Sequence, residues 1–169
     1  MDTLGLTHMV FGILALLAGT AVVLLRKGTR WHRTLGHVYL TSMIGLNVTA
    51  FFIYDLYGHF GPFHWLAVSS VLTLLAGMVP VLTRRPVGRW LEWHAVFINM
   101  SFIGLVAATA AEITSRIPGT EGAFGLVVGG TSAAIIGAGA LLMRRSLPGS
   151  MRRTPRQVRQ TSQTEPAHR

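Results

Sequence analysis

Cysteine is absent from the 169-residue sequence, and charged residues make up only 12% of it. Without a thiol the chain can form no disulfide, thiolate metal site, iron–sulfur cluster or cysteine nucleophile. Soluble domains carry about 25% charged residues, so a soluble fold of this size would lack a charged surface. Phosphate-binding and dinucleotide-binding glycine loops, zinc-protease helix motifs and serine nucleophile elbows are also missing. The sequence therefore gives no support to these enzyme classes.

Long apolar runs take the place of the missing charge. Half of the residues are hydrophobic, and runs of about 20 apolar residues are typical of membrane-spanning helices. Five runs occur, roughly at residues 4–25, 35–56, 62–82, 91–113 and 125–143. Glycine or proline in each connecting segment indicates a turn. The sequence predicts an all-α polytopic membrane domain over residues 1–143, with a four-helix bundle and a fifth helix rich in small residues.

Basic residues are concentrated in alternate connecting segments. Residues 26–33, 83–89 and 144–169 hold four, three and seven of the 15 lysines and arginines. The positive-inside rule places these segments in the cytoplasm, so we expect five spans with the N-terminus outside and the C-terminus inside. The tail 144–169 is too polar to fold alone, and its arginines should attract anionic lipids. It lacks the aromatic residues that stack on nucleic acid, so we expect no nucleic-acid partner.

Four histidines each lie about one turn inside the start of one of the first four runs. They are His8, His37, His64 and His94. Because successive helices alternate in direction, the first and third would lie near the outer surface and the second and fourth near the inner one. Bis-histidine haem requires two imidazoles that face each other across a gap between helices. The pattern therefore predicts one or two haem b groups, with transmembrane electron transfer to a quinone or another redox partner.

The histidine pattern leaves alternatives open. Histidines near helix ends also suit the interface, where their rings reach water or headgroups. The small residues Gly5, Gly12 and Gly19 would leave a groove for a macrocycle beside His8, although such stripes are commonly packing faces. At the inner surface, His32 is a rival of His37 as the partner of His94, and its earlier position in the headgroup zone favours His37.

Two acidic residues suggest a different kind of site. Asp55 and Glu112 each follow an inner histidine by 18 residues, which is five full helical turns. Both would therefore lie at the outer end, near His8, His64 and His59. Such a cluster can bind a divalent metal or relay protons, so the alternative is a non-haem accessory subunit or small transporter. The simpler interpretation is that both acids end their helices near water, with Glu112 paired to an arginine one turn later.

The fifth run carries small residues at four-residue spacing: Gly125, Gly129, Ala133 and Gly137. Small residues at this spacing allow helices to approach closely. The stripe predicts packing of this helix against the bundle, and it also allows a homodimer.

The segment Lys27–Tyr39, KGTRWHRTLGHVY, resembles a bacterial family of predicted membrane proteins of unknown function. The resemblance covers about the first 118 residues and continues through Gly61-Pro62-Phe63-His64 and Gly104-Leu105. The family pattern has a His-Arg pair at both inner helix starts, whereas this chain has His32-Arg33 and His94-Ala95.

The resemblance implies that His8, His32, His64, His94 and Glu112 are positions of the family pattern, and it implies no activity. A bacterial protein of this kind is expected in the inner (cytoplasmic) membrane. The layout is also similar to two-haem b-type cytochromes, in arrangement and not in motif.

Overall fold

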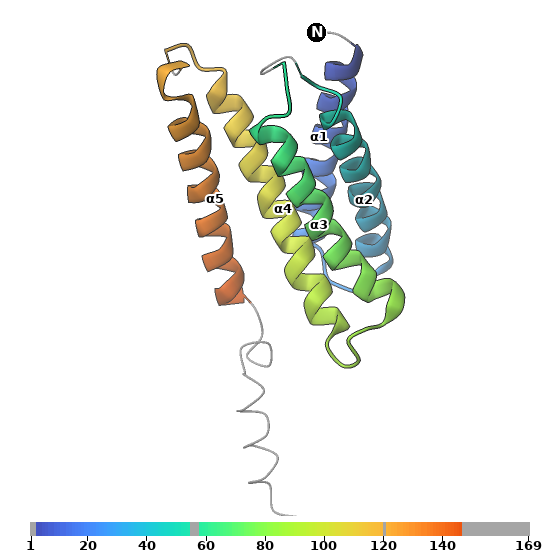
Figure 1. Cartoon of the computed structure of the whole chain (residues 1–169). Coiled ribbons are helices and arrows are strands. Elements are labelled where there is room, and N and C mark those ends of the chain that lie inside the picture. The colour runs from blue at the N-terminus through green and yellow to red at the C-terminus, as the bar shows by residue number, and fades with distance from the viewer. Residues whose placement is uncertain (1–2, 55–57, 120, 147–169) are drawn as a thin grey trace, which may run out of the picture.

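The computed structural model describes residues 3–54, 58–119 and 121–146, which form five long α-helices and one short 3-10 helix. The elements are α1 (Thr3–Leu24), α2 (Arg30–Ala50), α3 (Pro62–Thr83), α4 (Trp90–Ser115), η1 (Glu121–Ala123) and α5 (Phe124–Ser146). Successive helices run in opposite directions (Figure 1). The described residues contain no strand, so the all-α prediction is confirmed for them.

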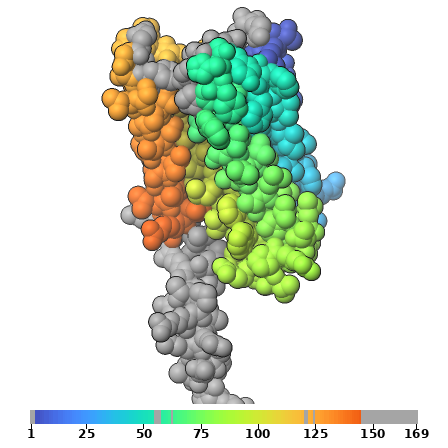
Figure 2. Space-filling model, in the orientation of Figure 1, coloured from blue at the N-terminus to red at the C-terminus, as the bar shows by residue number. Residues whose placement is uncertain are grey.

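The first four helices form two hairpins. α1 packs along α2 and α3 packs along α4, whereas contacts between the hairpins, from α2 to α3 and from α1 to α4, are sparser. α5 packs on α4, and Figures 1 and 2 show it along one edge of the molecule. The arrangement is the expected four-helix bundle with a fifth helix outside it.

The bundle core is small and apolar. Its buried cluster consists of Ala15, Ala18, Tyr39, Met43, Leu74 and Leu105, which come from all four bundle helices. Many large apolar side chains instead face outward; Leu17, Leu82 and Leu126 are 65%, 77% and 81% exposed. An apolar exterior on this scale is unusual in a soluble monomer, and it suits a lipid environment.

Four of the described helices are long and apolar enough to cross a membrane, namely α1, α3, α4 and α5. α2 is the exception, because Arg30, Arg33 and Asn47 lower its hydropathy. By length and hydropathy, four of the five predicted spans are therefore matched by a helix, and the span at α2 is not.

The bounds of α2 differ from the predicted run at residues 35–56. The helix begins at Arg30 because Thr29 caps it: the Thr29 Oγ1 accepts a hydrogen bond from the His32 backbone N–H at 3.2 Å. Such a cap satisfies a backbone donor that has no partner within the helix. The helix ends at Ala50, six residues before the apolar run ends. The other four helices agree with their predicted runs to within three residues at each end.

Candidate functional site

Four histidines lie on the inward faces of the bundle helices. Seven residues are close to two helical turns, so a residue seven positions from a buried one shares its face. Three histidines show this spacing to a residue that is at most 3% exposed; the pairs are His8 and Ala15, His32 and Tyr39, and His94 and Ser101. The fourth, His64, is itself only 4% exposed.

His8 links α1 to α2. Its Nδ1 lies 2.9 Å from the Oγ1 of Thr49. The single hydroxyl proton of Thr49 is directed to the backbone carbonyl oxygens of Gly45 and Leu46, at 2.9 and 3.0 Å. With that proton so used, the Thr49 oxygen accepts from His8, which places an imidazole proton on Nδ1.

His64 is enclosed by the α2–α3 connection. Its ring packs against those of Tyr54 and Phe60, with centroids 4.6 and 4.7 Å away. The Gly61 N–H donates to its Nδ1 at 3.1 Å, and its Nε2 is buried without a hydrogen-bond partner. Because Nδ1 accepts, the proton of the neutral ring lies on Nε2. A buried donor without an acceptor costs about 1–3 kcal/mol.

At the opposite end of the bundle, His94 links α4 to α3. Its Nδ1 lies 3.0 Å from the backbone oxygen of Gly77. A carbonyl oxygen only accepts, so Nδ1 carries the proton and Nε2 keeps its lone pair. His94 therefore carries a proton on Nδ1, as His8 does.

His32 is the imidazole close to His94. The two rings, and Lys27, are near enough to interact electrostatically, and the His32 ring also contacts the Val22 backbone. The His32 Nδ1 is buried and has no hydrogen-bond partner. Each end of the bundle thus has one histidine with an unpartnered buried nitrogen.

Lys27, in the connection between α1 and α2, binds the C-terminal end of α1. Its ammonium donates to the carbonyl oxygens of Val22 and Val23 at 2.8 and 2.6 Å, which satisfies the last turn of α1. A cation at a helix C-terminus also interacts favourably with the helix dipole. Partial burial lowers the pKa of Lys27 below its ordinary value.

The structure does not bring His37 to His94. His37 is exposed, and its Nδ1 donates to the carbonyl oxygen of Arg33, one turn earlier in the same helix, at 2.7 Å. His32 and His37 are five residues apart and therefore point about 140° away from each other at 3.6 residues per turn. The expectation that favoured His37 considered depth alone, and the inward face of α2 belongs to His32.

The predicted outer cluster is represented, in the part of the chain that the structure describes, by an electrostatic interaction between Glu112 and His8. Glu112 also forms an ion pair of 2.7 Å with Arg116, as the four-residue spacing suggested. His59 is exposed, and Asp55 lies outside the described residues. Within the described residues, no group of three or more His, Asp or Glu side chains is placed to hold a metal ion.

The glycine stripe of α1 is a packing face and not an open groove. A Cβ atom on Gly12 would lie 3.6 Å from Leu46, and one on Gly19 would lie 2.5 Å from the Phe102 ring and 3.0 Å from Tyr39. The neighbouring helices fill the space that the sequence suggested for a macrocycle. The groove expected on this face is therefore closed at Gly12 and Gly19.

The small residues of α5 are arranged differently from the expectation. Gly139 meets Ile103 of α4, with a Cβ position 2.7 Å from that side chain, whereas Gly125, Gly129 and Gly137 have no neighbour within 4 Å of their Cβ positions. The predicted stripe therefore does not pack against α4, because α5 uses another face for that contact. A homodimer through the stripe stays a prediction.

Two buried polar pairs within the bundle were missed from the sequence. The hydroxyls of Tyr39 and Ser101 lie 2.9 Å apart, and the Asn47 amide donates to the Ser70 Oγ at 3.1 Å. Polar residues within apolar runs were the available signal. These pairs join α2 to α4 and α3, and hence one hairpin to the other.

A bundle of long apolar helices with outward-facing hydrophobic side chains and buried polar pairs defines the class as an integral membrane protein. The chain belongs to the family described as predicted membrane protein (DUF2306), whose model matches residues 5–148. The match confirms the expected family of membrane proteins and extends beyond residue 118, to which the sequence resemblance reached. Neither the curated proteins nor the solved structures contain a match to this chain.

Proposed function

We propose that this protein binds haem b between its two helical hairpins and transfers electrons across the membrane. Each end of the bundle presents one histidine from each hairpin. His8 and His64 form one set, and His32 and His94 form the other. Bis-histidine ligation needs imidazoles from opposite sides of the iron, which two facing hairpins can supply.

The observation that carries the proposal is the pair of buried, unpartnered imidazole nitrogens, His32 Nδ1 and His64 Nε2. Buried polar atoms are nearly always hydrogen-bonded to protein or to a bound molecule, so two unpartnered nitrogens at opposite ends support a ligand at each end. His94 adds support, because it gives its Nδ1 proton to the backbone oxygen of Gly77 and so keeps the lone pair of Nε2. Histidines that ligate metals commonly donate their other N–H in this way.

The two ends fit haem unequally. At the His32/His94 end, both rings keep a lone pair that no protein group uses. At the His8/His64 end, the Gly61 contact keeps the proton on the His64 Nε2, so ligation there requires this ring to change tautomer and release Gly61. Bound haem would supply a reversible one-electron centre. The protein would orient its ligands through Thr49 and Gly77.

The proposal includes five spans, with the N-terminus outside and the C-terminus inside. The connections α1–α2 and α3–α4 lie at the same end of the bundle (Figure 1) and hold seven of the 15 lysines and arginines. Basic residues favour the cytoplasmic side. α2 packs along α1 and is therefore drawn into the membrane with it.

A second function is favoured by the electrostatic interaction between His8 and Glu112. An imidazole and a carboxylate that interact at one end of a membrane bundle can bind a cation or exchange protons. The protein would then be a non-haem accessory subunit or small transporter. In that case the His32/His94 set would have a structural role.

The test is a visible absorption spectrum of the full chain purified from haem-replete cells. We expect a reducible Soret band, and we expect His94→Ala to lower the haem content per chain. His37→Ala is the matched control, because this exposed ring bonds only to its own helix, and its haem content should equal that of the wild type. A colourless protein would refute the haem proposal. Metal analysis of wild type and Glu112→Gln would then test the second function.

A further inference from the structure

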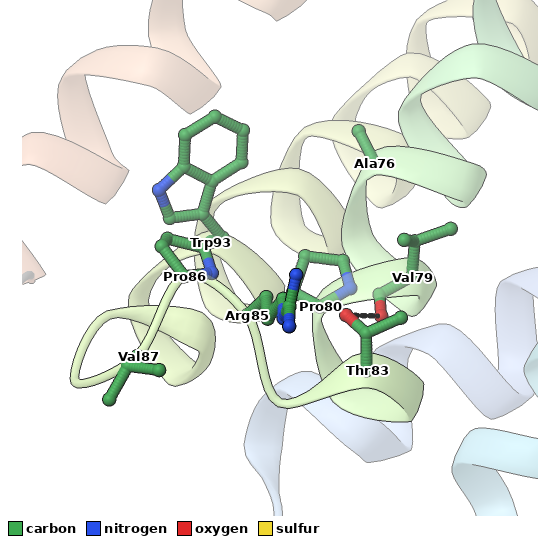
Figure 3. A pocket seen from close by; sticks show the side chains of 8 residues that line it. All are labelled: Ala76, Val79, Pro80, Thr83, Arg85, Pro86, Val87 and Trp93. Atoms are coloured by element: carbon green, nitrogen blue, oxygen red, sulfur yellow. Dashed lines mark hydrogen bonds between the residues drawn. The ribbon is translucent and has the colours of Figure 1, made fainter.

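An open hollow of about 730 Å³ lies where α3 ends and α4 begins. It is lined by Ala76, Val79, Pro80 and Thr83 of α3, by Arg85 and residues 86–87 of the connection, and by Trp93 of α4 (Figure 3). The hollow is separate from the histidine sets, since none of the four inward-facing histidines lines it.

The floor of the hollow suits a hydrocarbon chain. From Ala76 to Thr83, α3 rises about 10 Å at 1.5 Å per residue, so the floor extends two turns into a helix apolar enough to span a membrane. Val79 is about half exposed, and the Trp93 indole lines the hollow from the α4 side (Figure 3). Tryptophan favours the depth at which acyl chains meet headgroups.

The rim of the hollow suits an anion. Three arginines lie in the α3–α4 connection, and two of them are engaged. The Arg84 guanidinium lies 4.4 Å from the centroid of the Trp90 ring, and Arg89 pairs with Glu92 at 3.1 Å. Arg85 lines the hollow and has no acidic partner among the described residues.

We propose that this hollow binds an anionic phospholipid, with one acyl chain along α3 and the phosphate against Arg85. The apolar floor explains why a lipid chain enters, and the unpaired guanidinium explains the preference for a negatively charged headgroup. A cationic side chain close to anionic lipid contributes about 1 kcal/mol, which corresponds to about fivefold in affinity. The proposal does not depend on haem.

The test is native mass spectrometry of the full chain in detergent, titrated with phosphatidylglycerol or with phosphatidylcholine of the same acyl chains. We expect phosphatidylglycerol to bind more tightly and Arg85→Gln to weaken it about fivefold. Arg85→Lys should keep most of the preference. Arg30→Gln is the matched control, since this exposed arginine lies at the same end but outside the hollow. Its affinity should match that of the wild type.

Two further variants separate the hollow from general surface charge. Ala76→Phe fills the floor without changing any charge and should weaken phosphatidylglycerol binding. Phosphatidylglycerol with brominated acyl chains should quench tryptophan emission in the wild type, and less so in Trp93→Phe. Equal losses in Arg30→Gln and Arg85→Gln, or no headgroup preference in the wild type, would overturn the proposal.

Discussion

Tyr39 and Ser101 join α2 to α4 through hydroxyl groups that lie 2.9 Å apart, and both side chains are at most 3% exposed. Because a buried hydroxyl without a partner is costly, the hydrogen bond favours the arrangement in which these two helices meet. Double-mutant cycles place such bonds in membrane proteins at about 0.6 kcal/mol on average. We expect Tyr39→Phe and Ser101→Ala to show a coupling energy of that size in detergent-denaturation experiments.

The control for this cycle is Thr41→Val. Its hydroxyl is exposed and bonds only to the carbonyls of its own helix, so it should not couple to Ser101. A coupling energy of zero between Tyr39 and Ser101 would show that their contact does not stabilise the bundle.

Gly19 of α1 lies close to the aromatic rings of Tyr39 in α2 and Phe102 in α4. A Cβ there would lie 2.5 Å from Phe102, so Gly19→Ala should destabilise the protein by about 1–3 kcal/mol, the usual cost of overpacking. Gly104→Ala is the control, because its Cβ position has open space. Thermal unfolding of both variants checks the difference, and equal stabilities would contradict the close packing.

Thr29 holds the start of α2 and thereby the position of His32. Thr29→Ala should destabilise the protein by about 1 kcal/mol, because the backbone N–H of His32 loses its capping oxygen. Thr29→Ser keeps that oxygen and should retain most of the stability. Denaturation midpoints compare the two variants, and equal losses would mean that the methyl group and not the cap is important.

His64→Leu distinguishes a ligand from a structural histidine. In protein without a cofactor, the variant loses the Gly61 contact but also removes the unpartnered Nε2. Each effect is of the order of 1–3 kcal/mol, so the stability should stay within about 1 kcal/mol of the wild type. In haem-loaded protein, the same change should lower both the haem content and the melting temperature. If His64→Leu unfolds in the absence of any cofactor, His64 stabilises the fold and there is no reason to regard it as a ligand.

The helices could largely be predicted because an apolar run of about 20 residues matches the thickness of a bilayer when it is helical. Their ends depend on caps, and Thr29 starts α2 in a polar segment that hydrophobicity does not mark. The choice between His32 and His37 could have been made from spacing, because Tyr39, Met43 and Asn47 continue the face of His32 at intervals of seven, four and four residues.

How closely the helices pack against α1 could not be predicted. Whether Gly12 and Gly19 leave a groove depends on which side chains of other helices arrive there, and Leu46 and Phe102 fill that space. A stripe of small residues shows that a helix face is smooth, but it does not show which side chains of other helices cover that face. For the same reason, the sequence could not show that the glycine stripe of α5 faces away from α4.

The low hydropathy of α2 has a consequence for how the chain is made. If α2 crosses the membrane as proposed, this segment with Arg30, Arg33 and Asn47 gains too little from lipid to leave the translocation channel by itself. The smooth Ala15–Gly19 surface of α1 gives α2 a packing partner, because Tyr39 of α2 packs there. The first two helices would then enter the bilayer as one unit, and a bulky residue in α1 would impair insertion before it impaired any later step.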